Sequence, residues 1–240
     1  KDEHRVGYAF PMPSIQTYYR KKPVQYISNL LGHEGDGSLH ALLNEKGWIK
    51  GLSAGESEMD EGNSVMSVNI RLTEAGSAPV DEISAYLFAY LDLLKDGPIE
   101  EWIYQEQATV ALLAFRFSEK SSAMNAVRSI APALQHYPAE DLLVAPYLME
   151  EFDASLIRSF LTLLTRDNVL MTLSSPGYKG QSTEEWFGVS YDLELGEISV
   201  ATVDSGSLEL PDANPFLPEL LDLTQGDSLG PMPVIVAKGL

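Results

Sequence analysis

The side chains best suited to hold a metal ion in this sequence are four histidines, His4, His33, His40 and His136. A zinc site that hydrolyses amide bonds can be built from two histidines and a glutamate on one helical face, in the pattern His-x-x-Glu-His. Glycines follow His33 and Glu34, no second histidine follows His40 at that spacing, and Pro138 disrupts any helix after His136. The sequence therefore predicts no zinc site within these 240 residues.

Paired carboxylates and a glycine-rich turn are the other candidates for chemistry. The adjacent acids are Glu100-Glu101, Glu150-Glu151 and Glu184-Glu185. In an acidic chain such pairs are typical of solvated surfaces or of the first turn of a helix, where the dipole favours them. Residues 35–38 could hold an anion on backbone N–H groups, but they lack the lysine of a phosphate loop, and Glu34 and Asp36 would repel phosphate. We therefore predict no catalytic residue.

The composition of the chain limits the classes of partner that it can bind. The chain has 16 basic and 35 acidic residues, a formal net charge of −19, so binding to the polyanionic backbone of nucleic acid is disfavoured. The acidic surface either favours basic peptides or only keeps the protein in solution.

There is no cysteine, and no apolar run approaches the roughly 20 residues of a membrane helix. The first residues are not a signal peptide and lack an initiator methionine, so we expect a piece of a longer protein.

Hydrophobic periodicity indicates the elements that would position any site. Residues 5–10, 48–55 and 64–72 alternate as strands, and the pattern of residues 24–31 is helical. Ser38 can cap a second helix that buries Leu39, Leu42 and Leu43, and Gly47 can end it in a left-handed conformation. The longest helix should begin at Thr73 or Ser77 and end at residues 96–98.

The second half of the chain is predicted to be mainly helical. Helices are expected at residues 99–117, 123–135, 139–144 and 154–164, and strands at 167–173 and 198–203. Strands at both ends around a run of helices indicate an α+β fold, a mostly antiparallel sheet with helices packed on one face. We expect residues 1–207 to form this domain and residues 208–240, rich in proline and aspartate, to be an extended arm or linker.

Several blocks, in order and at matching spacing, resemble one protein family. They are Phe10-Pro11-Met12-Pro13, Leu31-Gly32-His33-Glu34-Gly35-Asp36-Gly37-Ser38-Leu39, Glu100-Glu101-Trp102, Ala114-Phe115-Arg116-Phe117, Tyr147-Leu148-Met149-Glu150-Glu151-Phe152, Thr183-Glu184-Glu185-Trp186-Phe187-Gly188 and Asn214-Pro215-Phe216-Leu217-Pro218. The chain resembles the second domain, which holds no zinc, of the insulin-degrading enzyme and pitrilysin family of zinc peptidases. The resemblance implies the metallohydrolase fold of the mitochondrial processing peptidases.

The resemblance also implies a site, an exosite where the N-terminal segment of a substrate adds as an extra β-strand. The residues that match it are Gly32, Glu34, Leu52, Ser53, Ala54, Gly55 and Glu56. Glu34 would pair with the ammonium group of the peptide. The sequence departs from the family pattern at Ala54, which is often glycine there, and near Ser28 and Asn29, which are often histidine. Without the resemblance, an ordinary edge strand with tight packing explains the same residues.

Three functions follow from the resemblance. In the first, this chain is the non-catalytic, substrate-binding domain of a zinc metalloendopeptidase, with zinc held by a first domain that this sequence does not include. Its partners would then be peptide substrates, the zinc-bearing first domain and the C-terminal half of the same protein, with no nucleic acid and no membrane. The alternatives are an inactive scaffold or peptide-binding protein like the processing peptidases, and a peptidase dedicated to maturing a cofactor from a precursor peptide.

Overall fold

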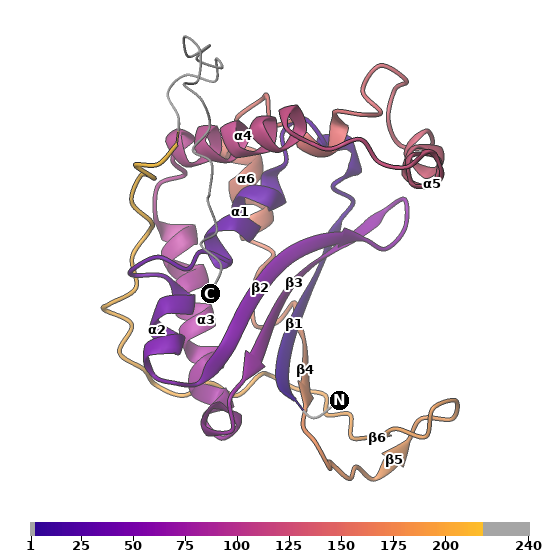
Figure 1. Ribbon diagram of the computed structural model, residues 1–240. Helices are drawn as coiled ribbons and strands as arrows, with labels where there is room; N and C mark the ends of the chain where they lie inside the picture. Colours follow the sequence, from indigo (N-terminus) through magenta and orange to yellow (C-terminus); the bar gives the residue numbers. More distant parts are fainter. Residues whose placement is uncertain (1–2, 218–240) are drawn as a thin grey trace, which may run out of the picture.

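The computed structural model describes residues 3–217, and its centre is a four-stranded antiparallel sheet (Figure 1). The strands are β1 (His4–Pro13), β2 (Ile49–Glu58), β3 (Asn63–Leu72) and β4 (Leu170–Ser174). They lie side by side in the order β2-β3-β1-β4. The first and last strands of that order, β2 and β4, are therefore the two edges of the sheet.

Alternating burial decides which face of the sheet meets the core. On β1 the buried side chains are every second residue, Val6, Tyr8, Phe10 and Met12. The register places Tyr8 opposite Val68 and Phe10 opposite Met66 of β3, and these partners are buried as well. Because successive side chains of a strand point to opposite faces, the intervening residues form a second face. The helices leave this second face open (Figure 1).

The helices cover one face of the sheet, as the sequence predicts. They are α1 (Pro23–Leu31), α2 (Leu39–Glu45), α3 (Val80–Asp96) and α6 (Ala154–Leu161). Two others, α4 (Glu101–Arg116) and α5 (Ala123–Ala133), follow α3, and α5 stands apart from the sheet and buries none of its residues (Figure 1). The predicted α+β class is confirmed. Among residues 3–217 no helix is long and apolar enough to cross a membrane.

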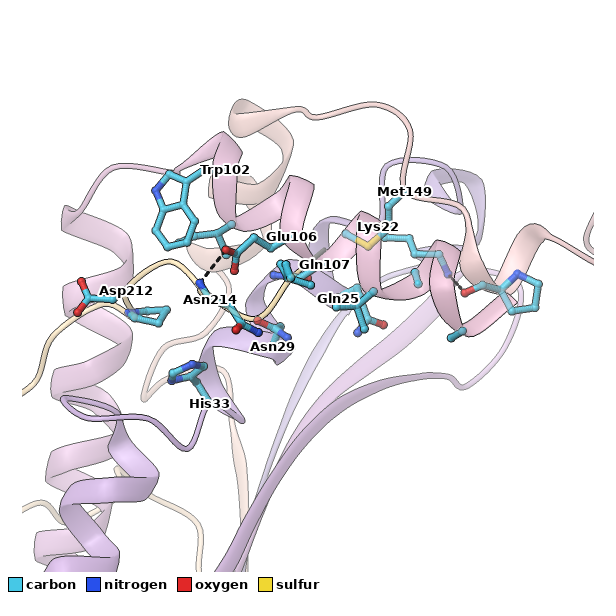
Figure 2. Close-up of a pocket in the computed structure, with 17 residues that line it drawn as sticks. Lys22, Gln25, Asn29, His33, Trp102, Glu106, Gln107, Met149, Asp212 and Asn214 are labelled. Atoms are coloured by element: carbon cyan, nitrogen blue, oxygen red, sulfur yellow. Dashed lines mark hydrogen bonds between the residues drawn. The ribbon is translucent and has the colours of Figure 1, made fainter. Parts of the chain in front are cut away.

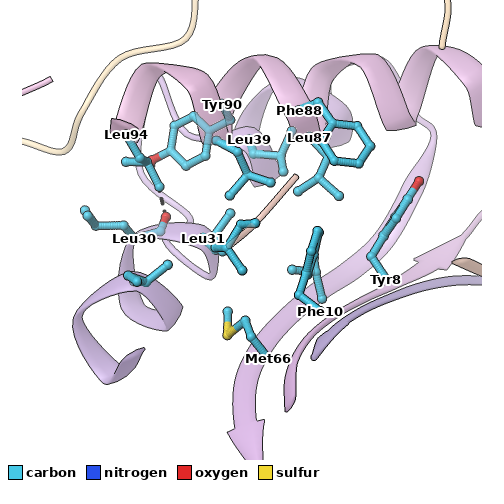
Figure 3. Close-up of a cluster of buried hydrophobic side chains, with 14 of the residues drawn as sticks. Tyr8, Phe10, Leu30, Leu31, Leu39, Met66, Leu87, Phe88, Tyr90 and Leu94 are labelled. Atoms are coloured by element: carbon cyan, nitrogen blue, oxygen red, sulfur yellow. Dashed lines mark hydrogen bonds between the residues drawn. The ribbon is translucent and has the colours of Figure 1, made fainter. Parts of the chain in front are cut away.

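Large aromatic side chains fill the space between the sheet and helix α3 (Figure 3). The ring of Phe88 meets the rings of Tyr8 and Phe10 edge to face, each at 6.4 Å between centroids. The hydroxyl of Tyr90 donates to the carbonyl of Leu30 in α1 at 3.3 Å, which ties α3 to α1. Burial raises the pKa of Tyr8 and of Tyr90 to about 12, so both phenols stay neutral in the core.

Local signals set the boundaries of α2 as expected. The Ser38 hydroxyl accepts a hydrogen bond from the Ala41 N–H at 3.0 Å and so caps the helix. Gly47 follows the helix with φ of +70°, a left-handed conformation that glycine adopts without a steric penalty. Leu39 and Leu43 are buried, whereas Leu42 is only half-buried.

Two predicted elements are wrong. Residues 139–144 form successive turns rather than a helix, with the N–H of Asp141 donating to Pro138 and that of Val144 to Asp141. This segment lies between two prolines, Pro138 and Pro146, and only the 3₁₀ turn η3 (Ala145–Tyr147) follows it. The Asp141 carboxylate instead accepts from Tyr19 at 2.7 Å and from Arg20.

The predicted strand at residues 198–203 is also absent from the described structure. Its apolar residues Ile198, Val200 and Val203 are half-buried against the core, which explains the alternating pattern. The backbone pairs with the start of α3 rather than with a strand, since the N–H of Ala201 donates to the carbonyl of Asp81 at 3.2 Å. A small hairpin, β5 (Ser182–Thr183) and β6 (Ser190–Tyr191), was not expected from the sequence.

Remaining short elements and the late segment complete the description. Two 3₁₀ turns are η1 (Gln16–Tyr18) and η2 (Ala75–Ser77). Residues 208–217 form no helix or strand, but Leu208 is buried and the N–H of Glu209 donates to the carbonyl of Gly37 at 2.9 Å. The rest of the arm predicted at residues 208–240 lies outside the described residues.

Candidate functional site

Strand β2, at the edge of the sheet, carries five of the seven residues predicted to bind a peptide: Leu52, Ser53, Ala54, Gly55 and Glu56. Leu52 pairs with Ile70 and Ala54 with Val68 of β3, so both face the helices and are half-buried. Ser53 lies on the open face and is exposed. An edge strand presents backbone N–H and C=O groups that no neighbouring strand takes up. The structure therefore places this segment where strand addition is geometrically possible.

Gly32 brings the end of helix α1 against the same strand. Its N–H donates to the carbonyl of Ser28 at 2.9 Å and closes the helix. A side-chain carbon added at Gly32 would lie 3.2 Å from the carbonyl oxygen of Ser28 and 3.9 Å from the backbone nitrogen of Ala54. A side chain would therefore be crowded by the carbonyl oxygen of Ser28, whereas its distance to Ala54 is ordinary van der Waals contact, so the end of α1 lies directly beside β2.

Glu34 is exposed in the loop between α1 and α2. It lines a cavity of about 770 Å³ that is also lined by Leu52 and Ser53 of β2. His40 and Asn44 of α2 line the same cavity. The structure thus brings the predicted partner of a peptide ammonium group to the same hollow as the edge strand.

Glu56 has a structural role that sequence reasoning missed. Its carboxylate accepts a hydrogen bond of 2.9 Å from the hydroxyl of Ser28, a buried residue of α1. The same hydroxyl lies 3.4 Å from the sulfur of Met66 on β3. Because Glu56 is tied to the helix, it holds β2 in place beside α1. The pair is far apart in the sequence, and nothing in the local pattern indicates it.

A second hollow, of about 360 Å³, lies between α1 and α4 and was not predicted (Figure 2). One wall is a polar stripe that recurs every four residues, formed by Gln25 and Asn29 of α1 and by His33 just after the helix. Across from it the side-chain amide of Gln107 is buried, and both its polar atoms lack a hydrogen-bond partner among residues 3–217. The spacing of the stripe and the helix at residues 99–117 were visible in the sequence, but the packing of one beside the other was not.

Residues of the late segment close one side of this second hollow. The backbone N–H of Asn214 donates to the Glu106 carboxylate of α4 at 2.9 Å (Figure 2). On the other side, Lys22 donates to the carbonyl of Pro146 at 2.9 Å, and burial lowers the pKa of its ammonium group. These contacts join the start of α1, helix α4 and the segment after residue 208.

Metal binding is not supported by the arrangement of side chains. Within residues 3–217, no three histidine, aspartate or glutamate side chains come together in a way that could hold a metal ion. Zinc sites in proteins need three or four such ligands around one ion. The residues present therefore do not form a zinc site, and no step of hydrolysis is assigned to them.

The antiparallel sheet with helices packed on one face defines an α+β domain, and the comparisons with known proteins place it more closely. Two family models match the sequence, "Peptidase M16 inactive domain" over residues 1–110 and "Middle or third domain of peptidase_M16" over residues 115–239. The chain belongs to the M16 family of peptidases, the metalloprotease family of the insulinases and pitrilysins.

Individual relatives agree with this assignment. The chain is 36% identical over 226 residues to the insulin-degrading enzyme of Homo sapiens, covering 91% of this chain and 22% of that protein. It is 28% identical over 238 residues to the A-factor-processing enzyme of Saccharomyces cerevisiae, covering 97% of this chain and 23% of that protein. The chain thus spans about a quarter of the length of the curated relatives it matches.

Among solved structures, pitrilysin shares the fold. Its TM-score is 0.83 at 23% sequence identity, over 91% of this chain and 24% of that one. The likeness at this identity concerns the fold alone, and it confirms the antiparallel sheet with helices on one face. The relatives are peptidases, and the family model that matches residues 1–110 is described as an inactive domain.

Proposed function

We propose that this chain is the peptide-anchoring, non-catalytic domain of a larger zinc metalloendopeptidase. The observation that carries the proposal is the position of β2, an edge strand whose residues match the family's exosite and lie against Gly32. Family membership and the match to a quarter of longer peptidases support the same conclusion. On this proposal residues 1–207 act as the domain, and residues 208–240 lead toward the second half of the protein.

Anchoring would occur by strand addition. The N-terminal segment of a peptide lies beside β2 and pairs with the main-chain groups of Leu52 to Gly55, which gives affinity with little demand on sequence. Neighbouring strands lie about 4.8 Å apart, so the peptide backbone runs at that distance from β2. Alternate side chains of the peptide then face the helices and the open side of the sheet, and these contacts supply specificity.

The first residue of the peptide is held at the end of α1. Glu34 lines the same hollow as Leu52 and Ser53, so its carboxylate can accept from the peptide ammonium group. Anchoring one end of a long peptide raises its effective concentration at a distant catalytic centre. Zinc and the general base would be held by another domain of the whole protein. There they would activate the water that hydrolyses the peptide.

The experiment measures binding of an N-terminal peptide to the full-length protein with an inactive catalytic centre. Methylating the backbone nitrogens of the peptide one at a time should weaken binding at alternate positions, since only every second N–H of an added strand faces β2. Ala54→Pro should abolish this binding because it places a ring where the peptide backbone must pass.

Ser53→Ala is the matched control, since strand addition uses the main chain. It should leave the affinity within about 1 kcal/mol of the unmodified protein, the size of one net hydrogen bond. Thermal melting confirms that each variant is folded. If methylation at every position left the affinity unchanged, or if a folded Ala54→Pro protein bound the peptide like the unmodified protein, β2 would not be the anchor.

A further inference from the structure

Three cations gather on the open face of the sheet, although the chain as a whole is strongly acidic. They are Arg5 at the start of β1, Arg71 at the end of β3 and Lys50 at the start of β2, and all three are exposed. These strand ends meet at one end of the sheet, close to the N-terminus of the described chain (Figure 1). The cluster is therefore a product of antiparallel pairing, not of sequence proximity.

The strand register brings the cations side by side. Arg5 lies directly opposite Arg71, and Arg71 lies opposite Gly51. An irregularity of β2 between Ile49 and Gly51 inserts Lys50 beside this row. Like charges directly opposite one another destabilise a sheet. Within residues 3–217, Arg71 and Lys50 take part in no ion pair, so this repulsion is not offset by a carboxylate of their own.

The cations border a hollow rather than a flat surface. Two rows of residues cross the open face there, one made of Gly51, Arg71, Arg5 and Ser174, the next of Ser53, Asn69, Gly7 and Thr172. Both rows line the cavity of about 770 Å³ that adjoins β2. Each row contains a glycine over which a neighbouring side chain lies, Arg71 over Gly51 and Asn69 over Gly7. The hydroxyl and amide groups add neutral hydrogen-bonding partners.

One carboxylate, that of Glu3, already lies beside these cations and shows which kind of group they bind. Arg5 donates to a single carboxylate oxygen of Glu3, through Nε at 3.1 Å and through a terminal nitrogen at 2.6 Å. The hydrogen bond and charge of Arg5 lower the pKa of Glu3, and the positive charges of Arg71 and Lys50 lower it further. A carboxylate at this position therefore interacts favourably with all three cations.

Arg71 also reaches toward the anchor strand. A side-chain carbon at Gly51 would lie only 2.9 Å from a terminal guanidinium nitrogen of Arg71, so this group lies across β2 at its glycine. A strand added beside β2 would run about 4.8 Å further on. A glutamate of that strand, pointing to the open face, spans this distance and meets the guanidinium.

We propose that the part of this hollow lined by Arg5, Lys50 and Arg71 is a carboxylate-binding subsite, which holds an acidic side chain of a peptide anchored on β2 and in which that side chain competes with Glu3 for the three positive charges. The inference rests on the proposed function and adds the class of substrate, peptides with an acid near the N-terminus. The net charge of −19 repels such peptides at long range. The subsite acts at contact distance, where a charge-assisted hydrogen bond outweighs a screened long-range repulsion.

The test uses the full-length protein, catalytically inactive, and peptides with glutamate or glutamine at each of the first four positions in turn. Glutamate should bind about tenfold more tightly than glutamine, the effect of one charge-assisted hydrogen bond. This advantage of glutamate should appear only at alternate positions of the peptide, because every second side chain faces the open side of the sheet. Arg71→Gln and Lys50→Gln should each reduce it, and Glu3→Gln should increase it.

Arg128→Gln on α5 and Lys120→Gln before it are matched controls, exposed and remote from the sheet. They should leave the glutamate advantage unchanged. No advantage for glutamate in the unmodified protein, or an advantage that survives Arg71→Gln or falls equally in the controls, would overturn the subsite. Because the glutamine peptides report on strand addition alone, their normal binding in these experiments separates failure of the subsite from failure of the anchor.

Discussion

The hydroxyl of Ser28 donates a hydrogen bond of 2.9 Å to the Glu56 carboxylate and so joins the buried side of helix α1 to the edge strand β2. Strand addition needs an edge whose position is already set before the peptide arrives, because ordering the strand on binding would cost affinity. This contact, together with the approach of Gly32 to Ala54, holds the proposed anchor against the helix layer.

Ser28→Ala should loosen β2. Removing the hydroxyl leaves the Glu56 carboxylate without its partner, so we expect a loss of about 1 kcal/mol in the free energy of unfolding. Hydrogen exchange of the β2 amides should quicken more than that of β1, which lies inside the sheet. Glu56→Gln keeps an acceptor for the hydroxyl and serves as the milder control. Equal protection of β2 in all three proteins would contradict this role.

Glu34→Gln should weaken the capture of peptides that carry a free N-terminus. The change removes the charge that pairs with the ammonium group but preserves the size of the side chain. Affinities of free and acetylated versions of one peptide are compared by calorimetry in the full-length protein. The expected result is a loss confined to the free peptide. A similar loss for both versions would indicate a structural effect instead.

The start of helix α6 should make stability depend on acidity. Lys21 lies 2.9 Å from Asp153, whose carboxylate also accepts from the N–H of Leu156 at 3.0 Å and from the hydroxyl of Ser155. These contacts, Lys21 first, hold the pKa of Asp153 well below its usual range. A lowered folded pKa stabilises the protein above the unfolded value of about 3.9, and this contribution is lost as pH falls toward the folded value.

Melting temperatures between pH 6 and pH 2 test this contribution. The unmodified protein should lose stability faster than Asp153→Asn as the pH falls below about 4, so the difference between the two curves should shrink steadily toward pH 2. Lys21→Met should also make the melting temperature depend less steeply on pH, because it removes the largest cause of the lowered pKa of Asp153. Parallel curves for all three proteins would show that Asp153 does not contribute in this way.

Zinc content should not depend on the histidines near the proposed anchor. His33→Gln and His40→Gln in the full-length protein should leave the zinc measured after dialysis unchanged, since no metal-holding group of three ligands exists among the described residues. Metal analysis by mass spectrometry measures the ratio of zinc to protein. A drop of one zinc per chain in either variant would place a ligand in this domain.

Local sequence was sufficient wherever neighbours in the chain decide the structure. The alternation of Val6, Tyr8 and Phe10 indicated β1, and Ser38 and Gly47 indicated the ends of α2, because burial periodicity and capping act over a few residues. The same reasoning was wrong for residues 139–144, which form successive turns between Pro138 and Pro146. It was also wrong for residues 198–203, whose apolar alternation is explained by packing against the hydrophobic core.

Tertiary structure alone decided the relationships among residues distant in the chain. The sequence showed the types of Arg5, Lys50 and Arg71, but only the strand order β2-β3-β1-β4 placed them in one hollow. The Ser28–Glu56 hydrogen bond likewise depends on how α1 packs on the sheet. Periodicity reports which side of an element is buried, whereas the order of strands and the register between them arise from long-range pairing that no short segment encodes.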